Sequence, residues 1–290
     1  MTYLAFRHRW HAIARAVAGA LLCLCLASAW AEAAEEPVTL APHRAVYDLT
    51  LTAARSSTSV TSVAGRLVYD LTGSPCEGYT QNTRLVTLMA QQSGGSLLSD
   101  LRSTTWEDAA GKSFRFETTT YRDEKVSEAI TGDANRQGGI GEIKVEISKP
   151  EKRSLFLPAG AYFPVQHTIA LIKAARAGKA SFRADLYDGS DKGEKVYDTV
   201  AALGALQGAG SNRKLPAVVN AERLDAVRAW PVSLAFFDVG SSRADSLPSY
   251  EIAFWMFENG VSRKLTIDYG DFALDGVLKG IVFHEPSKCP

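Results

Sequence analysis

Hydrophobic and polar residues alternate with a period of two along most of the chain after residue 40. Tyr47 and Leu49 stand two positions apart on one apolar face, and the alternation returns at 143–147, 182–186 and 265–269. Successive side chains of a β-strand point to opposite faces of the sheet. The pattern therefore predicts antiparallel strands with one face in the core and the other in water.

Short turn sequences rich in glycine separate these strands, at intervals of roughly ten residues. They include Gly94-Gly95, Asp275-Gly276 and Asn259-Gly260. Asn259-Gly260 is the strongest hairpin signal, because a type I′ turn needs positive φ at both central residues. Strands spaced this regularly predict a mainly β fold, as a barrel, a sandwich or a long meander.

One segment has helical spacing instead, and it predicts a single amphipathic helix over about 164–177. Pro164 suits the first helical position, and Lys173 and Arg176 suit the last turn. Phe163 is a poor N-cap, because its side chain has no oxygen to accept a hydrogen bond from the first N–H groups. Such a helix has to pack on a sheet face or close the mouth of a barrel.

The first 31 residues have the order of a secretory signal peptide. Arg7, Arg9 and Arg15 precede the uncharged run 16–31, which ends in small residues. We place the cleavage site after Ala31, with Ala29 and Ala34 as alternatives. An uncleaved membrane anchor is the alternative, but sixteen uncharged residues fall short of the roughly 20 that span a bilayer. We therefore expect an exported chain with no transmembrane segment in its mature part.

Charge and cysteine content change once the signal peptide is removed. The chain has 32 basic and 32 acidic residues, so losing three arginines leaves 32 − 3 = 29 against 32. This balance gives no electrostatic basis for binding nucleic acid. Of four cysteines only Cys76 and Cys289 remain, and an even pair in an exported protein predicts one disulfide. A tether to the penultimate residue favours a single domain over residues 32–290.

Some strands near the C-terminus are apolar on both faces. The residues that carry this feature are Phe236, Phe254, Trp255 and Phe257. Two interpretations are open: burial between the sheet and the helix, or an apolar concavity that holds a lipid or acyl chain. Under the second interpretation these four side chains are the candidates to face the ligand.

Motifs for catalysis are missing from the sequence. It has no Gly-x-Ser-x-Gly elbow, no Walker loop and no His-Glu-x-x-His. His43, His167 and His284 lack the spacing of a metal site, and 188–193 departs from a calcium loop at Lys192. We therefore predict no catalytic residue, no cofactor and no metal. A hydrolase with a composite site built around one histidine remains the alternative.

Several segments resemble one known family. Leu40-Ala41-Pro42-His43-Arg44-Ala45-Val46-Tyr47-Asp48-Leu49 resembles the opening strand of the EipB (envelope integrity protein B) family of exported alphaproteobacterial proteins. Phe163-Pro164-Val165-Gln166-His167-Thr168 is similar to its helix, and Tyr187-Asp188-Gly189-Ser190-Asp191 to its central hairpin. Glu258-Asn259-Gly260-Val261-Ser262 is similar to its C-terminal strands. The resemblance runs from about Leu40 to Cys289.

This resemblance implies a fold, a location and a role. The fold would be a β-spiral, a single large antiparallel, open barrel-like sheet with a helix beside it and a disulfide matching Cys76 and Cys289. The protein would maintain cell-envelope integrity in the periplasm, with an architecture similar to the lipoprotein carriers LolA and LolB. It would act as a binding or scaffold protein for envelope proteins or lipids, holding a lipid, acyl chain or extended peptide. No catalytic residue is attributed to the family.

An outer-membrane barrel is a further alternative for the fold. The regular charges at Glu142, Lys144 and Glu146 argue against it, because they fit a face in contact with water and not with lipid.

Overall fold

The computed structural model describes residues 36–56, 58–137, 142–239 and 246–289. Val38–Pro290 form one compact unit by their internal contacts. The predicted signal peptide, residues 1–31, lies outside the described residues. The statements below concern the unit that begins at Val38.

The unit is built on one antiparallel sheet of 14 strands, in the order β8-β7-β6-β5-β4-β3-β2-β1-β14-β13-β12-β11-β10-β9. The strands are β1 His43–Ala54, β2 Val60–Ser74, β3 Gly78–Gln91, β4 Ser96–Glu107, β5 Ser113–Arg122, β6 Lys125–Arg136, β7 Ile143–Lys149, β8 Arg153–Leu157, β9 Ser181–Leu186, β10 Tyr197–Leu203, β11 Ala229–Asp238, β12 Tyr250–Phe257, β13 Ser262–Asp268 and β14 Phe272–Phe283. The prediction of a mainly β, open antiparallel sheet is confirmed.

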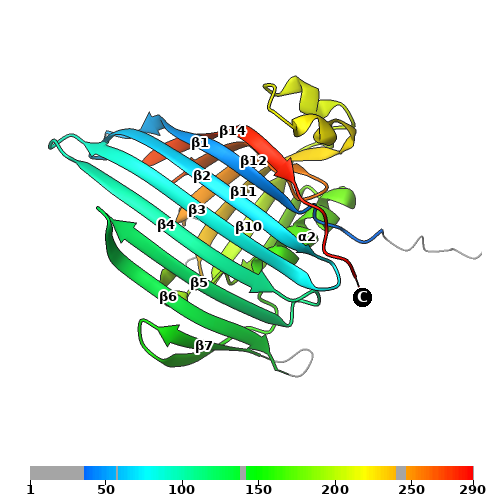
Figure 1. The fold of residues 1–290 in the computed structure, drawn as a ribbon, viewed down its shortest axis with the longest axis horizontal. Helices are drawn as coiled ribbons and strands as arrows, with labels where there is room; N and C mark the ends of the chain where they lie inside the picture. The colour runs from blue at the N-terminus through cyan, green and yellow to red at the C-terminus, as the bar shows by residue number, and fades with distance from the viewer. Residues whose placement is uncertain (1–35, 57, 138–141, 240–245, 290) are drawn as a thin grey trace, which may run out of the picture. The chain divides into compact units, whose positions relative to one another are not determined.

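The two halves of the sheet grow in opposite directions from one central pair, and the sheet as a whole curls. The first and last strands, β1 and β14, pair antiparallel, with His43 opposite Phe283 and Ala54 opposite Phe272. From this pair β2–β8 extend one way and β13–β9 the other. In Figure 1, β1–β4 cross the front of the molecule and β10–β12 lie behind them. Strands β8 and β9 are the two edges, so the barrel-like sheet stays open.

The predicted helix is present as α2, Pro164–Arg176, between the two edge strands. It is the only α-helix in the part of the chain that the structure describes. Short 3-10 helices follow in the connections, as η1 Asp191–Gly193, η2 Ser211–Lys214 and η3 Ala221–Ala226. The last two belong to the segment between β10 and β11.

The hairpin between β12 and β13 forms where Asn259-Gly260 predicted one, but its turn differs. Only Gly260 has positive φ, at 84°, and Asn259 does not. The backbone N–H of Phe257 donates to Val261 O at 2.8 Å, and that of Gly260 to Phe257 O at 2.8 Å. The loop is thus longer than a two-residue type I′ turn and uses glycine for the left-handed position alone.

Buried side chains gather in separate clusters on the two faces of the sheet. On the inner face, Leu171 and Ile172 of α2 pack with Trp230 and Met256. A second cluster joins Phe114 and Phe116 of β5 to Phe163 and Tyr187. A third lies against the opposite face of β12, where Phe257 packs with Ala221 and Leu224. Helix α2 therefore fills only part of the space that the sheet encloses.

Candidate functional site

Helix α2 is held against the sheet by a carboxylate that is remote in sequence. Phe163 gives no side-chain cap. Instead Glu107, at the end of β4, accepts hydrogen bonds from the backbone N–H groups of Val165, at 2.7 Å, and Gln166, at 3.0 Å. These N–H groups have no partner within the helix. Glu107 thus caps the N-terminus of α2 from the end of β4, and this contact orients the face of the helix that packs on the sheet.

Arg136 locks the loop that leads into the helix. Its guanidinium donates hydrogen bonds to the carbonyl oxygens of Gly111, Ala159 and Ala161, at 2.8, 2.6 and 2.6 Å. It also lies over the Phe163 ring, 5.0 Å from its centroid.

Burial raises the pKa of Glu107 to about 7, although its two backbone hydrogen bonds and the charge of Arg136 oppose that shift.

His167 of α2 is buried and paired with a threonine hydroxyl. Its Nε2 lies 2.9 Å from Thr199 Oγ1, and that hydroxyl donates in turn to Ala184 O at 2.7 Å. Because the hydroxyl proton is already used, Nε2 must carry the proton and donate. Burial lowers the pKa of His167 to about 4, so the ring is neutral at pH 7. These contacts give His167 a structural role in joining α2 to β10.

An apolar cavity of about 320 Å³ lies between α2 and the inner face of the sheet. Its wall comes from strands of both halves of the sheet and from the helix. The lining residues are Leu40, His43, Tyr47, Leu67, Tyr69, Leu71, Gln81, Pro164, His167, Thr168, Leu171, Leu186, Leu234, Ile252, Phe254, Met256, Gly260, Ser262 and Leu265. Most of these side chains are aliphatic or aromatic, which is typical of pockets for apolar ligands.

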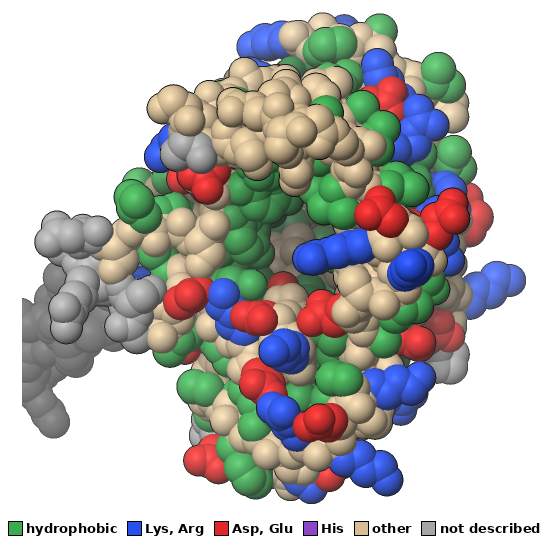
Figure 2. Space-filling view, turned by 90° about the vertical axis from the view of Figure 1, so that its left-hand side faces the viewer, with side chains coloured by type: hydrophobic (Ala, Val, Ile, Leu, Met, Phe, Trp, Pro, Cys, Tyr) green, Lys and Arg blue, Asp and Glu red, His purple; other side chains and the backbone are tan. Residues whose placement is uncertain are grey.

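The space-filling view shows that one side of the molecule is hollowed (Figure 2). Hydrophobic side chains line the wall of this hollow, and lysine, arginine, aspartate and glutamate side chains surround its mouth. The interior of the sheet is thus partly a filled core and partly open space. An apolar wall behind a charged rim can hold an apolar chain while the rim remains in water.

Three polar side chains of the cavity wall have protein partners. The Tyr47 hydroxyl donates to Ser262 O at 2.6 Å, and His43 Nδ1 donates to Ala41 O at 2.7 Å. His167 is bound to Thr199, as described above. Among the described residues, no group of three or more histidine, cysteine, aspartate or glutamate side chains could hold a metal ion. The cavity therefore offers mainly van der Waals contact.

The four aromatic residues singled out in the sequence lie in three different places. Phe254 lines the cavity. Phe236 is buried beside it in the core, stacked on Tyr250 with 4.2 Å between ring centroids. Trp255 and Phe257 lie on the opposite face of β12, in the cluster with Leu224. Sequence reasoning missed the cavity wall on β2, where Leu67, Tyr69 and Leu71 lie two positions apart on one face of the strand.

Cys76 and Cys289, which the sequence predicted to pair, are bonded to each other. Cys76, in the turn between β2 and β3, and Cys289 form a disulfide with Cα atoms 5.7 Å apart. Five residues before Cys289, His284 Nε2 lies 3.0 Å from Asp70 Oδ1, and the backbone N–H of His284 donates to Pro42 O. The C-terminal segment is thereby fixed along β2, beside the wall of the cavity.

The fold and the cavity define a class of open, barrel-like β proteins that curl around one helix and enclose an apolar space. No helix in the described parts of the chain has both the length and the apolar character needed to cross a membrane. Residues 34–285 match the model of the EipB-like family, and the chain belongs to this family.

Two similar proteins come from Brucella abortus. A protein named cell envelope integrity protein EipB is 36% identical over 280 residues, which cover 97% of each chain. A crystal structure, described as a beta-barrel-like protein of a domain of unknown function, matches with a TM-score of 0.78 and 36% identity. That match covers 86% of this chain and all of the other.

Proposed function

We propose that this protein acts in the periplasm, after export, as a binding protein that contributes to cell-envelope integrity by holding one apolar chain beneath α2. The observation that carries the proposal is the 320 Å³ apolar cavity. The name of the Brucella relative supports the envelope role. The proposal assigns no catalytic step to any residue.

The size and chemistry of the cavity favour an acyl chain or a short apolar peptide segment. Its volume lies at the lower end of the range for ligand sites, about 300–1,000 Å³. Burying apolar surface stabilises a complex by about 25 cal/mol per Å², and no cationic side chain lines the wall. A ligand would thus place its apolar part in the cavity and leave a polar group at the rim.

Binding of a fluorescent fatty acid tests this proposal. The mature protein is titrated with cis-parinaric acid, and native mass spectrometry of the purified protein looks for apolar molecules that co-purify. We expect saturable binding with one probe per chain. Absence of both a co-purifying apolar molecule and saturable fluorescence would overturn the ligand-holding role.

A matched pair of variants locates the site. Leu67 is half-buried on the cavity wall, whereas Val282 is 52% exposed on the other face of the sheet. Leu67→Trp fills the cavity and should weaken probe binding about tenfold or more, since it removes several kcal/mol of apolar burial. Val282→Trp adds a similar side chain to the surface and should leave binding unchanged. Circular dichroism of both variants checks that the fold is kept.

A further inference from the structure

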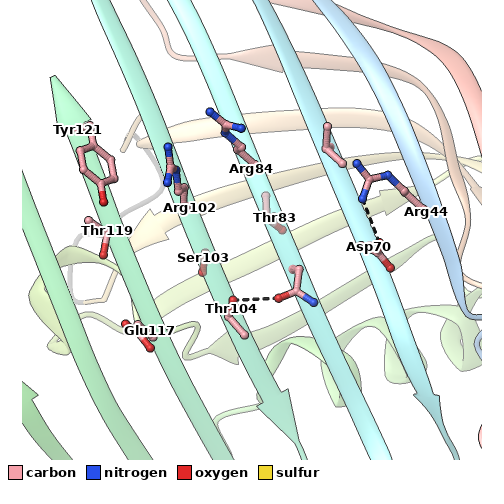
Figure 3. Close-up of a pocket in the computed structure, with 12 residues that line it drawn as sticks. Arg44, Asp70, Thr83, Arg84, Arg102, Ser103, Thr104, Glu117, Thr119 and Tyr121 are labelled. Atoms are coloured by element: carbon pink, nitrogen blue, oxygen red, sulfur yellow. Dashed lines mark hydrogen bonds and ion pairs between the residues drawn. The ribbon is translucent and has the colours of Figure 1, made fainter. Parts of the chain in front are cut away.

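A second hollow lies on the outer face of the sheet, away from α2 and the apolar cavity. It has a volume of about 670 Å³ and crosses strands β1 to β5 (Figure 3). Side chains alternate along each strand, so Arg84 and Asn82 face outward where Gln81 faces the inner cavity. The two hollows therefore share a sheet but not a face. We call the second hollow the outer groove. Its lining is mainly polar, whereas the lining of the cavity is mainly apolar.

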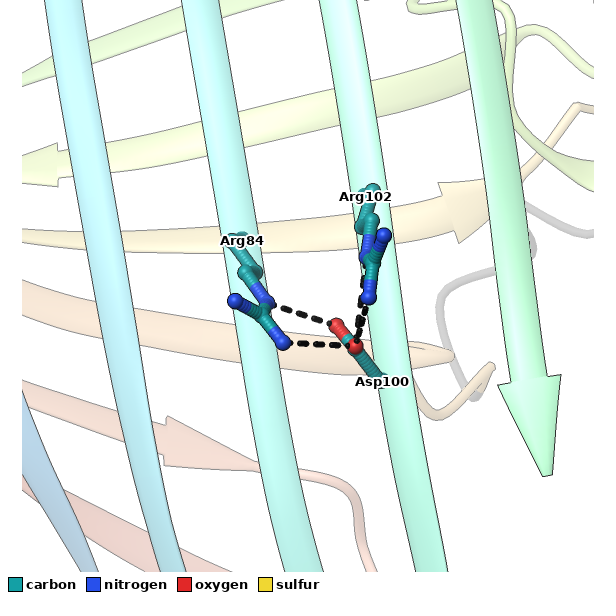
Figure 4. Close-up of polar contacts among 3 residues, drawn as sticks. All are labelled: Arg84, Asp100 and Arg102. Carbon is teal, nitrogen blue, oxygen red and sulfur yellow. Dashed lines mark hydrogen bonds and ion pairs between the residues drawn. The ribbon is translucent and has the colours of Figure 1, made fainter. Parts of the chain in front are cut away.

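Two arginines at the centre of the groove share one carboxylate. Arg84 of β3 and Arg102 of β4 are directly opposite in the strand register. Like charges in this arrangement repel each other. Asp100 bridges them: it accepts from Arg84 Nε at 3.0 Å and Nη2 at 2.9 Å, and from Arg102 Nε at 3.2 Å and Nη2 at 2.8 Å (Figure 4).

This arrangement leaves one net positive charge and several unused donors. Each guanidinium presents five N–H groups, and within the described part of the chain neither Nη1 has a protein acceptor. The side chains of Arg84 and Arg102 are 55% and 53% exposed, so both can reach a ligand in the groove. A planar oxyanion such as a carboxylate matches these donors in geometry and charge.

Groups that recognise hydroxyls stand on either side of the arginines. Asp70 of β2 lies on one side and already pairs with Arg44 at 3.4 Å and His284 at 3.0 Å, and Glu117 and Thr119 lie on β5. Asn82 accepts a hydrogen bond from Thr104 at 2.9 Å, which leaves its amide N–H₂ as a donor. Carboxylates flanking a cationic centre would repel an anionic membrane surface, whereas they accept hydrogen bonds from sugar hydroxyls. Five adjacent strands span about 19 Å across the groove, enough for several sugar rings.

One aromatic ring completes the groove. The Arg102 guanidinium lies over the Tyr121 ring, 4.8 Å from its centroid, at the β5 side. This contact holds both flat groups in place and presents a surface on which a sugar ring can pack. We propose that the outer groove, centred on Arg84 and Arg102, binds an acidic oligosaccharide through a carboxylate at its centre and hydroxyl groups on either side.

The proposal is independent of the apolar cavity, and it can be tested on the intact mature protein. The probe is a tetrasaccharide of alternating glucuronate and N-acetylglucosamine, and its methyl ester serves as the uncharged match. Calorimetric titration at low ionic strength should show binding of the acid and at least about tenfold weaker binding of the ester. Raising the salt to about 0.15 M should weaken binding of the acid, since exposed charges are screened.

Three variants locate the binding site. Arg84→Gln and Arg102→Gln should each weaken binding of the acid about tenfold. Arg153→Gln is the matched control, because Arg153, on the edge strand β8, is also 53% exposed and also pairs with carboxylates, those of Glu151 and Glu194. It should leave binding unchanged. Thermal unfolding of all three variants checks that the fold is kept.

Four results would overturn the proposal. The first is equal affinity for the acid and its ester, and the second is unchanged affinity in both groove variants. The third is full displacement of the tetrasaccharide by an equal concentration of inorganic phosphate, which would indicate a bare oxyanion site. The fourth is tighter binding to phosphatidylglycerol vesicles than to the tetrasaccharide at equal charge, which would indicate a lipid surface.

Discussion

The carboxylate of Glu107 caps a helix that begins 57 residues later: its Oε2 lies 2.7 Å from the backbone nitrogen of Val165. This contact with β4 fixes the position of the first turn of α2 and the orientation of the helix over the apolar cavity. The carboxylate is buried, and burial raises its pKa from 4.5 to about 7. A group that positions the helix thus titrates close to neutral pH.

Glu107 makes the stability of the fold depend on pH in a defined direction. Between pH 4.5 and about 7 the folded protein binds more protons at this site than the unfolded chain does. The contribution is full below pH 4.5 and is lost as the pH rises through 7. Glu107→Gln should remove about 3 kcal/mol of this pH dependence, as measured by urea unfolding from pH 4.5 to 8.

Two comparisons make the Glu107 experiment specific. Glu107→Ala removes the cap altogether and should cost about 1–2 kcal/mol relative to Glu107→Gln. The neighbouring charges, Asp108 and Arg136, act on Glu107 in opposite directions and are kept in both variants. An unchanged pH profile in Glu107→Gln would contradict the role assigned to this carboxylate.

His167 should act in the opposite direction at acid pH. Its pKa is lowered from 6.5 to about 4, so the unfolded chain binds more protons between these values. Its contribution to stability is present above pH 6.5 and is lost as the pH falls through 4. His167→Gln should reduce the change in unfolding free energy between pH 4 and 6.5 by about 3 kcal/mol. Probe binding should survive the change, and its complete loss would return His167 to consideration as a functional group.

Gly260 is required by the turn between β12 and β13. It has φ 84°, and a Cβ there would lie 2.8 Å from Leu40 Cδ2 on the cavity wall. Gly260→Ala should cost about 1–3 kcal/mol of unfolding free energy. Gly280→Ala is the control, because a Cβ at this position of β14 meets nothing within 4 Å. Equal thermal stability of the two variants would show that the turn tolerates a side chain.

Phe254 and Trp255 are neighbours on opposite faces of β12 and should separate binding from stability. Phe254 lines the cavity, whereas Trp255 packs in the cluster under η3. Alanine at either position should destabilise the fold, by about 3–5 kcal/mol if fully buried and less for these half-buried rings. Only Phe254→Ala should also change the affinity for cis-parinaric acid. A change in affinity from Trp255→Ala alone would place the ligand elsewhere.

The disulfide should stabilise the whole unit. Cys76 and Cys289 are 213 residues apart, so the bond closes a very long loop. Replacing both by serine should cost about 2–5 kcal/mol of unfolding free energy. Adding a reductant should lower the melting temperature of the unchanged protein and have no effect on the double variant. Equal melting temperatures with and without the bond would show that the loop is already held by other contacts.

Features that depend on neighbours in sequence were predictable. The alternation at 143–147 and 182–186 corresponds to β7 and β9, and the helical spacing corresponds to α2 at Pro164–Arg176. Strand and helix periods follow from local backbone geometry, so they are visible in a short window of residues. The hairpin at Asn259-Gly260 was predictable too, but its turn type was not, because the loop also bonds to a distant segment: the Ala41 N–H donates to Asn259 O at 2.8 Å.

Features that depend on distant strands were not predictable in the same way. The alternation in β12 placed Phe254 and Trp255 on opposite faces, yet it did not show which face meets the cavity. That choice depends on the segment with η2 and η3, which covers Trp255 and Phe257. The pairing of Arg84 with Arg102 around Asp100 likewise requires the register between β3 and β4.

The amino-acid sequence alone thus determined the strands, the helix, the pair of cysteines and the family resemblance, because each is written in local spacing or in residue identity. Tertiary structure alone decided that β1 pairs with β14, that Glu107 caps α2, and that one sheet has an apolar hollow inside and a polar groove outside. The physical reason is that curling brings together side chains far apart in the chain. The burial and the protonation of these side chains then depend on neighbours in space, which cannot be identified from a short stretch of sequence.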